Sequence, residues 1–444
     1  SEYNHPDNAI TTVAPWPATT TVGPFKVGFL PMSHSIPESS SLVIDVAGDR
    51  LIHSGDFKID MTPGVGEAYD PEVWADVSKG GVKALICDST NVFSQNAGRS
   101  EATVGPEIEK LLGSAQGMVV ATTFASNVAR VKTLADAGER AGRSVVLLGR
   151  AMKRMVEASL ETGVMKDFPA VISPEDARGV PRENLMLLVT GSQGERRAAS
   201  AQLANGKYMG ITMKEGDTFL FSSKTIPGNE RGVIRIVNAY SEMGVSVVDG
   251  EDGHYHVSGH ANRPDLLAVH DLMKPKMVIP MHGEHRHLRE HAMLAGENGR
   301  ASIIATNGMM LDLTGKKPKV AEHVEAARTY RDGDVYIGEL DGVIRDRIRM
   351  ALNGHVMISL ILENNQMVGD AWCETMGLPE TGTSNAPLVD VLEEDVNQLI
   401  GRASKRSLAD DDKLDEAVRK AVRRSANDEI GKKPEVTVVI SRLG

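Results

Sequence analysis

Residues 256–260 read HVSGH, and residues 277–284 read MVIPMHGE, so an apolar run ends directly before His282. The run is typical of a buried strand, which predicts that His282 lies at a strand end, held by rigid backbone and open to solvent. Neutral imidazole is the commonest metal ligand in proteins. The two stretches therefore predict an α/β fold with a phosphate-handling metal site at its strand ends. The alternative is a pair of loops with ordinary surface histidines.

Two earlier segments repeat this pattern of a strand followed by a residue that can bind metal. Residues 29–35 read FLPMSHS and residues 50–58 read RLIHSGDFK. A carboxylate after a strand can bridge two divalent ions, and imidazoles can complete each coordination shell. We therefore expect His34, Asp56 and His282 to be metal ligands. Taken singly, each would more often be a polar residue that stabilises a turn.

These motifs, together with several others in the same order along the chain, resemble the ribonuclease J family of bacteria. The further motifs are SHSIPE at 33–38, HSGDFK at 53–58, CDSTN at 87–91, TFASN at 123–127, TGSQGE at 190–195 and IPGNE at 226–230. The resemblance covers essentially the whole chain. It implies an α/β protein with a metallo-β-lactamase αββα sandwich, incomplete at its N-terminus, an inserted β-CASP parallel α/β domain and a small C-terminal α/β domain.

The expected domain boundaries follow from this resemblance. They are 1–93 for the first part of the metallo-β-lactamase domain, 94–244 for the β-CASP domain, 245–365 for the second part of the metallo-β-lactamase domain and 366–444 for the C-terminal domain.

The strand and helix patterns agree with an insertion. Short apolar runs predict strands at 25–30, 41–46 and 84–87, and further strands at 118–122 and 144–148 alternate with helical stretches at 126–141 and 151–162. Such alternation indicates a parallel sheet. The metal-capable motifs resume only at residue 256, so the second unit is predicted to lie within the first.

The last part of the chain has a helical pattern of its own. Apolar residues at helical spacing begin at Leu388 and again at Leu414, and an apolar run at 436–440 predicts a strand. Pro387 suits a helix start and Gly431 a helix end. In the family this domain often serves self-association, although the sequence alone equally allows a packing role.

One family motif is absent. The chain contains no His-x-His-x-Asp-His, which in the family supplies most ligands of both metals. Residues 1–21 are polar and proline-rich, as a connecting segment would be. We therefore expect that much of the first β-lobe is missing from this chain. Because a catalytic zinc needs about three protein ligands, the chain alone is expected to bind metal weakly and to be inactive.

For the complete enzyme, the resemblance implies metal-dependent hydrolysis of RNA. Two divalent ions, zinc first and manganese or magnesium as alternatives, would be bridged by Asp56. His260 would protonate the leaving 3′ oxygen, with Asp88 orienting its ring. By itself the segment 88–91 is more often a turn or helix cap. The predicted phosphate-binding residues are His256, Ser258 and Gly259, with a second pocket formed by Ser192, Ser222 and Ser223.

The resemblance also predicts the kind of digestion and the partners. We expect 5′-to-3′ exonuclease activity that prefers 5′-monophosphate ends, with some endonuclease activity, in rRNA processing and mRNA decay. Expected partners are single-stranded RNA, a second copy in a dimer or tetramer, and an RNA helicase or the ribosome. Alternatives are a non-catalytic RNA-binding or scaffold paralogue, an apo fragment, a small-molecule hydrolase of the same fold and a DNA-directed relative.

Length and composition favour a large cytoplasmic enzyme. The 444 residues are 41% hydrophobic and 25% charged, as in ordinary globular proteins of several domains. No apolar run approaches the roughly 18 residues of a membrane span, so no membrane partner is expected. Cys87 and Cys373 are predicted to be core thiols. A net charge of −11 repels the negative backbone of nucleic acid at long range. A substrate channel, however, needs only a local path of positive charge.

Overall fold

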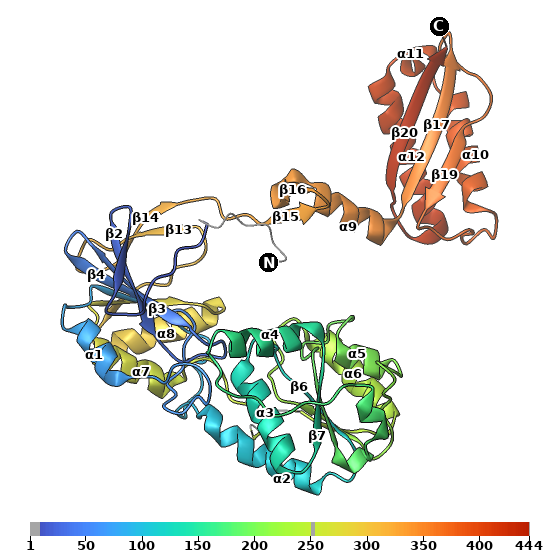
Figure 1. Ribbon diagram of the computed structural model, residues 1–444. Coiled ribbons are helices and arrows are strands. Elements are labelled where there is room, and N and C mark those ends of the chain that lie inside the picture. Colours follow the sequence, from blue (N-terminus) through green and yellow to red (C-terminus); the bar gives the residue numbers. More distant parts are fainter. Residues whose placement is uncertain (1–8, 250–253, 444) are drawn as a thin grey trace. The chain divides into compact units, whose positions relative to one another are not determined.

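The computed structural model describes residues 9–249 and 254–443, and its contacts divide the chain into two compact units, Ser1–Val324 and Glu325–Gly444 (Figure 1). The first unit contains two large sheets, and the second contains a smaller one. The prediction of an α/β protein with several parallel strands is confirmed.

The first sheet has seven strands in the order β1-β2-β3-β4-β5-β11-β12. Its strands are β1 Thr19–Val22, β2 Phe25–Pro31, β3 Ser40–Val46, β4 Asp49–His53, β5 Ala84–Asp88, β11 Met277–Met281 and β12 Ala301–Ser302. The first four run antiparallel, whereas β4, β5, β11 and β12 run parallel to one another. Strands β5 and β11 pair directly although the whole second sheet lies between them in the sequence.

One face of this sheet is covered by the helices α1 Pro71–Ser78, α7 Arg263–Met273 and α8 His285–Glu297 (Figure 1). Trp74 of α1 is fully buried there, with its ring 5.9 Å from Phe57 and 5.3 Å from Tyr69. The opposite face is also apolar, since residues such as Phe29 and Ile44 alternate with core residues and are only partly buried. A sheet with two apolar faces suits a layered sandwich.

The second sheet has the order β10-β9-β6-β8-β7, and all its strands are parallel. Its strands are β6 Val119–Thr122, β7 Ser144–Leu148, β8 Leu185–Val189, β9 Thr218–Phe221 and β10 Ser246–Val248. Helices lie on both faces: α2 Val104–Ser114, α3 Val128–Arg140 and α4 Arg150–Glu161 on one, and α5 Ala199–Ala204 and α6 Glu230–Glu242 on the other. Covered on both sides, β8 is apolar and buried along its whole length.

Short elements join these layers. They are the 3₁₀ helices η1 Glu101–Thr103, η2 Asp176–Gly179 and η3 Arg182–Asn184, and the hairpin of β13 Met309–Asp312 with β14 Lys319–His323. Helices α3 and α4 match the helical stretches predicted at 126–141 and 151–162.

The second unit begins with a hairpin and a helix and ends in a mixed sheet. Its elements are β15 Thr329–Asp332, β16 Val335–Gly338, η5 Glu339–Asp341, α9 Val343–Asn353, β17 His355–Glu363, β18 Gln366–Met367, β19 Trp372–Met376, α10 Leu388–Gly401, α11 Lys405–Leu408, α12 Asp411–Ile430 and β20 Glu435–Leu443. Pro387 precedes α10, and Gly431 ends α12 at φ 65°. The predicted boundary between residues 365 and 366 falls inside this unit, because β17 pairs with β20 along its whole length.

The cysteines are core thiols, as predicted, since Cys87 and Cys373 are free and buried. Among the helices that the structure describes, none combines the length and the apolar character needed to cross a bilayer.

A buried carboxylate, Asp60, lies where the two sheets of the first unit meet. Its Oδ2 atom is 2.7 Å from Lys58 Nζ and accepts a hydrogen bond of 2.8 Å from the backbone N–H of Glu101. Burial alone would raise the pKa of Asp60, but the hydrogen bonds from Lys58 and Glu101 outweigh it and hold the pKa below its ordinary value. Asp60 therefore stays ionised and links β4 to the start of the inserted domain.

We expect Asp60→Asn to lower the free energy of unfolding at pH 7 by about 1–3 kcal/mol, because the buried Lys58 ammonium loses its carboxylate partner. The pKa of Asp60 is lower in the folded than in the unfolded chain, so its contribution is present above about pH 4 and is lost as the pH falls further. Urea unfolding at pH 7 and pH 3.5 measures both effects. Asp76→Asn, at an exposed ion pair with Lys79, is the control and should change little. Equal deficits at the two pH values would contradict the assignment.

Candidate active site

Three parallel strands end at one edge of the first sheet, and each delivers a polar side chain there. Asp56 follows β4, Asp88 is the last residue of β5, and His282 directly follows β11. Because β4, β5 and β11 are neighbours, their carboxyl ends meet. His260 reaches the same place from the loop that precedes α7.

These four side chains form one group. Ligand atoms of Asp56, Asp88, His260 and His282 all lie within 4.8 Å of one another. His260 Nδ1 is 2.7 Å from Asp88 Oδ2, and His282 Nδ1 is 3.0 Å from Asp56 Oδ1 and 3.4 Å from Asp88 Oδ1. Imidazole nitrogens and carboxylate oxygens are donors that zinc and manganese accept. The group therefore fits one divalent ion.

His282 adopts a backbone conformation that is uncommon for a residue with a side chain. Its φ is 54°, in the left-handed region. The Thr90 hydroxyl lies 3.2 Å from the His282 carbonyl oxygen and 3.1 Å from Nδ1, although its shortest contact is with Asp88 Oδ1 at 2.7 Å. Strained residues of this kind concentrate at functional sites.

Asp88 is the buried anion of the group, with a relative exposure of 1%. Burial alone would raise the pKa of Asp88, but hydrogen bonds from His260 and His282 and from the backbone N–H of Thr90 hold it well below its usual range. The same contact raises the pKa of His282. The carboxylate of Asp88 is thus ionised and fixes the orientation of two imidazoles.

His34, a predicted metal ligand, lies beside this group but outside it. Its ring centroid is 5.3 Å from that of His260, and its Nδ1 is 2.7 Å from the carbonyl oxygen of Gly259. A carbonyl only accepts, so Nδ1 carries the proton and Nε2 is the atom left for a ligand. The role of His34 as a ligand stays a prediction. With His34 included, five donors still fall short of two ions with about three protein ligands each.

Gly259 is needed for a close approach within the protein. A Cβ atom added there would lie 2.3 Å from Ser35 Oγ and 2.9 Å from the His34 ring. The expected approach of the Gly259 backbone to a phosphate stays a prediction, whereas the described contact is with residues 34 and 35.

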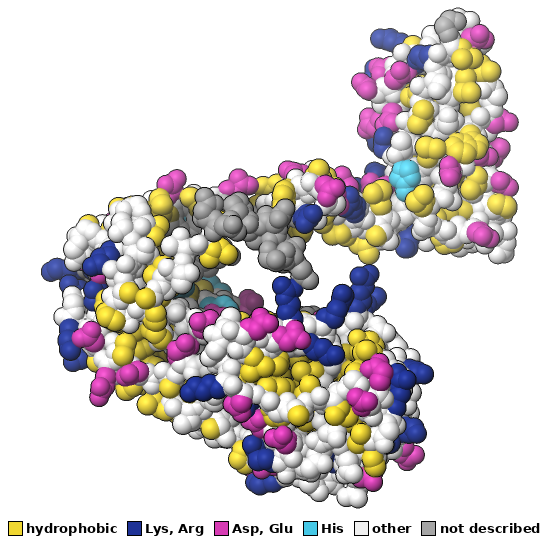
Figure 2. All heavy atoms as spheres, viewed as in Figure 1, with side chains coloured by type: hydrophobic (Ala, Val, Ile, Leu, Met, Phe, Trp, Pro, Cys, Tyr) yellow, Lys and Arg dark blue, Asp and Glu magenta, His cyan; other side chains and the backbone are white. Residues whose placement is uncertain are grey.

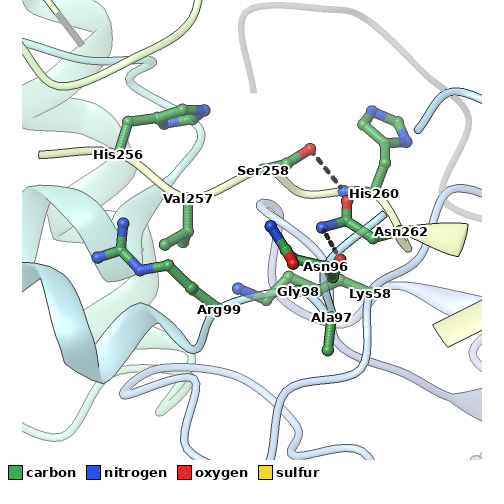
Figure 3. Close-up of a pocket in the computed structure, with 10 residues that line it drawn as sticks. All are labelled: Lys58, Asn96, Ala97, Gly98, Arg99, His256, Val257, Ser258, His260 and Asn262. Atoms are coloured by element: carbon green, nitrogen blue, oxygen red, sulfur yellow. Dashed lines mark hydrogen bonds between the residues drawn. The ribbon is translucent and has the colours of Figure 1, made fainter. Parts of the chain in front are cut away.

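A cavity of about 280 Å³ opens next to His260 (Figure 3). Its lining residues are Lys58, Asn96, Ala97, Gly98, Arg99, His256, Val257, Ser258, His260 and Asn262. Among the described lining residues are two cations, Lys58 and Arg99, and several hydrogen-bond donors, and none is a carboxylate, although Asp60 pairs with Lys58 from outside the cavity. Such a lining suits an anion such as a phosphate group.

Sequence reasoning missed several residues of this cavity and its support. Lys58 and Asn91 stand at the ends of two quoted motifs, HSGDFK and CDSTN, so a signal was present. Asn91 Nδ2 donates to Ser258 Oγ at 2.8 Å and to the His260 carbonyl at 3.1 Å, which holds the loop in place. Asn96 and Arg99 carry no motif signal, and only the fold brings them to the cavity.

The three serines predicted as a second phosphate pocket are all buried. Ser222 Oγ donates to the Tyr255 carbonyl at 2.7 Å and accepts from Arg130 at 3.0 Å, so this hydroxyl is engaged within the protein. Ser223 Oγ is buried without a hydrogen-bond partner in the part of the chain that the structure describes. Next to Ser192, Gln193 Nε2 donates to the Lys224 carbonyl at 3.0 Å, which brings the two serine-bearing loops together.

A sheet with metal donors at its strand ends and an inserted parallel α/β domain defines a metallo-hydrolase with a β-CASP insertion. Family models agree over most of the chain. Residues 116–240 match the ribonuclease J beta-CASP domain, residues 232–305 the Zn-dependent metallo-hydrolase RNA specificity domain, and residues 342–443 the ribonuclease J C-terminal domain.

Curated relatives lead to the same family. The chain is 37% identical over 428 residues to Ribonuclease J of Sinorhizobium meliloti, covering 95% of this chain and 75% of that one. It is 34% identical to Ribonuclease J of Corynebacterium glutamicum, covering 84% and 53%, and 35% identical to Ribonuclease J 1 of Streptococcus pyogenes, covering 77% and 62%. The chain belongs to the ribonuclease J family. It spans between about half and three quarters of the length of these relatives.

We expect the chain to bind zinc through Asp56, Asp88 and His282, and His282→Ala to weaken that binding by more than about tenfold, because it removes a direct ligand. Isothermal titration with zinc, followed by elemental analysis after dialysis, measures affinity and stoichiometry. His285→Ala, three residues further along and exposed, is the matched control. Equal zinc affinity in the two variants would place the metal elsewhere.

Proposed function

We propose that the chain forms the catalytic body of a metal-dependent ribonuclease that hydrolyses RNA phosphodiesters. One observation carries the proposal: the donor group of Asp56, Asp88, His260 and His282 directly adjoins a cavity lined by Lys58 and Arg99. His260 belongs to both. A phosphate in the cavity would therefore lie beside a metal held by Asp56, Asp88 and His282, with His260 between the metal and the cavity.

The side chains support a division of labour in hydrolysis. In the complete enzyme two divalent ions, zinc first, would lower the pKa of a water and so supply the hydroxide; the donors that the structure describes are enough for one of them. The ionised carboxylate of Asp88 accepts a hydrogen bond from His260 Nδ1. The Nε2 atom of His260 is therefore the one that can carry a second proton. His260 is thus able to deliver that proton to the leaving 3′ oxygen, while Asp88 stabilises the charged ring.

Local charge supports a nucleic-acid substrate in spite of the net charge of −11. Lys58 and Arg99 line the cavity, and Figure 2 shows further Lys and Arg side chains gathered along one edge of the inserted domain. A positive path of this kind is enough to guide a phosphate backbone. We propose single-stranded RNA as the substrate.

The buried hydroxyl of Ser223 supports a pocket for a terminal phosphate. An unpartnered buried hydroxyl costs stability, which is a reason to look for a ligand that satisfies it. We propose that Ser223, with Ser192, binds the 5′-monophosphate of RNA. That pocket would favour 5′-to-3′ digestion from processed ends, with some endonuclease activity, in rRNA processing and mRNA decay in the cytoplasm.

The second unit supports self-association. Its sheet exposes Trp372, Met376, Ile361 and Val439, with relative exposures of 50%, 73%, 42% and 42%. Apolar side chains exposed together mark interaction surfaces. We propose a dimer or tetramer built through this unit; an RNA helicase or the ribosome is a further proposed partner.

In the complete enzyme, His260→Gln is expected to lower kcat for RNA hydrolysis by about 10²–10⁴-fold, because the leaving oxygen loses its proton donor. KM should change little. Matched RNA and DNA oligomers, assayed with zinc or manganese and with chelator, measure the activity, and His285→Gln is the control. Faster cleavage of DNA would reassign the substrate. RNA binding without any metal-dependent cleavage would favour the non-catalytic alternative.

Ser223→Ala is expected to reduce the preference for 5′-monophosphate over 5′-hydroxyl RNA by about tenfold, the value of one hydrogen bond to a charged group. The ratio of kcat/KM for the two RNAs is the measurement. Ser159→Ala removes another buried hydroxyl of the inserted domain, one that bonds the Met155 carbonyl, and should leave the ratio unchanged. An unchanged ratio in Ser223→Ala would remove this serine from the pocket.

A further inference from the structure

Arg130 of α3 is a fully buried guanidinium at the junction of the two sheets of the first unit. Its Nε and Nη2 atoms donate to the Glu101 carboxylate at 2.5 and 2.8 Å. Its Nη1 lies 3.0 Å from both the carbonyl oxygen and Oγ of Ser222, 3.2 Å from the Tyr255 carbonyl and 3.4 Å from His256 Nδ1. One side chain thus joins the start of the inserted domain, the end of β9 and the segment that returns to the first sheet.

The contact with Arg130 favours one of the two nitrogens of His256 as the site of the proton. A guanidinium has only donors and stays protonated in proteins. Nη1 shares its two hydrogens among four acceptors, and the contact with His256 Nδ1 is the longest of them. Next to this cation an Nδ1 lone pair is still preferred over an N–H, which puts the proton of the neutral ring on Nε2. The other tautomer would set an N–H of the ring against an N–H of Arg130.

The surroundings of His256 also keep the ring neutral. Burial lowers its pKa to about 3, and the charges of Arg130, Lys224, Lys58 and Arg99 act in the same direction. Two carboxylates bonded to these cations are already engaged: Glu101 by Arg130, and Asp60 by Lys58. His256 therefore keeps one protonation state across the physiological pH range.

We infer that Arg130 is a positioning residue that fixes His256 as a neutral donor whose Nε2 proton is available to a phosphate in the cavity beside His260. His256 and His260 both line that cavity (Figure 3). The inference rests on the proposed function, because it concerns phosphate binding at the same site. Lys58 and Arg99 supply positive charge to the cavity, and His256 supplies a directed hydrogen bond that does not change with pH.

The tautomer is measured directly on the metal-free full chain. Nitrogen chemical shifts of ¹⁵N-histidine-labelled protein, with His256 assigned by the loss of its signals in His256→Gln, should show a single neutral ring protonated at Nε2 from pH 5.5 to 8.5. Arg130→Lys keeps a positive charge beside Glu101 but lacks the second guanidinium nitrogen that contacts His256 Nδ1. The two neutral tautomers of His256 should then be present as a mixture. A ring protonated at Nδ1 in the unaltered chain would overturn the inference.

Two replacements of His256 test the same point without touching Arg130. Glutamine can place its amide nitrogen near the position of Nε2, whereas asparagine places it near Nδ1. The dissociation constant for a 5′-phosphorylated RNA oligomer should rise less than about threefold in His256→Gln and about tenfold or more in His256→Asn, because only the latter loses the bond to phosphate. Equal losses in the two variants would contradict the inference.

Arg143 provides the matched control. It is also a buried arginine of the inserted domain, but its hydrogen bonds within the described residues go to backbone carbonyls, among them those of Gly117 and Leu112. Arg143→Lys should lower the melting temperature without changing the His256 tautomer or RNA affinity. If Arg143→Lys changes the tautomer as Arg130→Lys does, a general loss of packing in the inserted domain explains the effect and the inference fails. The tautomer is read without RNA, so a chain that bound no RNA would contradict the proposed function alone.

Discussion

The parallel pairing of β5 with β11 is the constraint on which the rest of the first unit depends. It sets Asp88 opposite Met281, so the last residue of one strand and the histidine after the other lie at the same sheet edge. The chain leaves β5 at that edge, returns to it at His260 after the inserted domain, and then crosses through α7 to begin β11 at the opposite edge. The same pairing therefore positions the donor group. The chain between the two strands also contributes most of the residues that line the cavity.

Three buried charges lie around the site, and each of them has a partner. Asp88 contacts two imidazoles, Arg130 forms a two-bond ion pair with Glu101, and Asp60 forms an ion pair with Lys58. Burying an ion costs free energy unless an opposite charge and hydrogen bonds compensate it. Here the compensation also fixes orientation: the imidazoles cannot turn without breaking contacts to buried anions or to Arg130. The site is thus arranged before a substrate arrives, which is what transition-state stabilisation requires.

Much of the fold follows from local patterns. The strands β2, β3 and β5 and the helices α3 and α4 agree with apolar runs and helical spacing, and Pro387 and Gly431 lie at helix ends for reasons of backbone geometry. The extent of the second unit did not follow, because the partner of β17 is β20, at the far end of the chain. Asn96 and Arg99 were missed for a similar reason: a loop residue without a motif shows its role only through its neighbours.

The sequence by itself determined the family, the layered α/β class and the identity of the residues able to bind metal or phosphate, because those depend on local spacing and on side-chain chemistry. Only the tertiary structure decided which atoms face one another. It placed His260 Nδ1 on Asp88, packed Gly259 against His34, engaged the hydroxyl of Ser222 within the protein and set Arg130 against His256. The reason is physical: each of these contacts joins segments that are distant along the chain, and their distance and direction are set by how whole strands and helices pack.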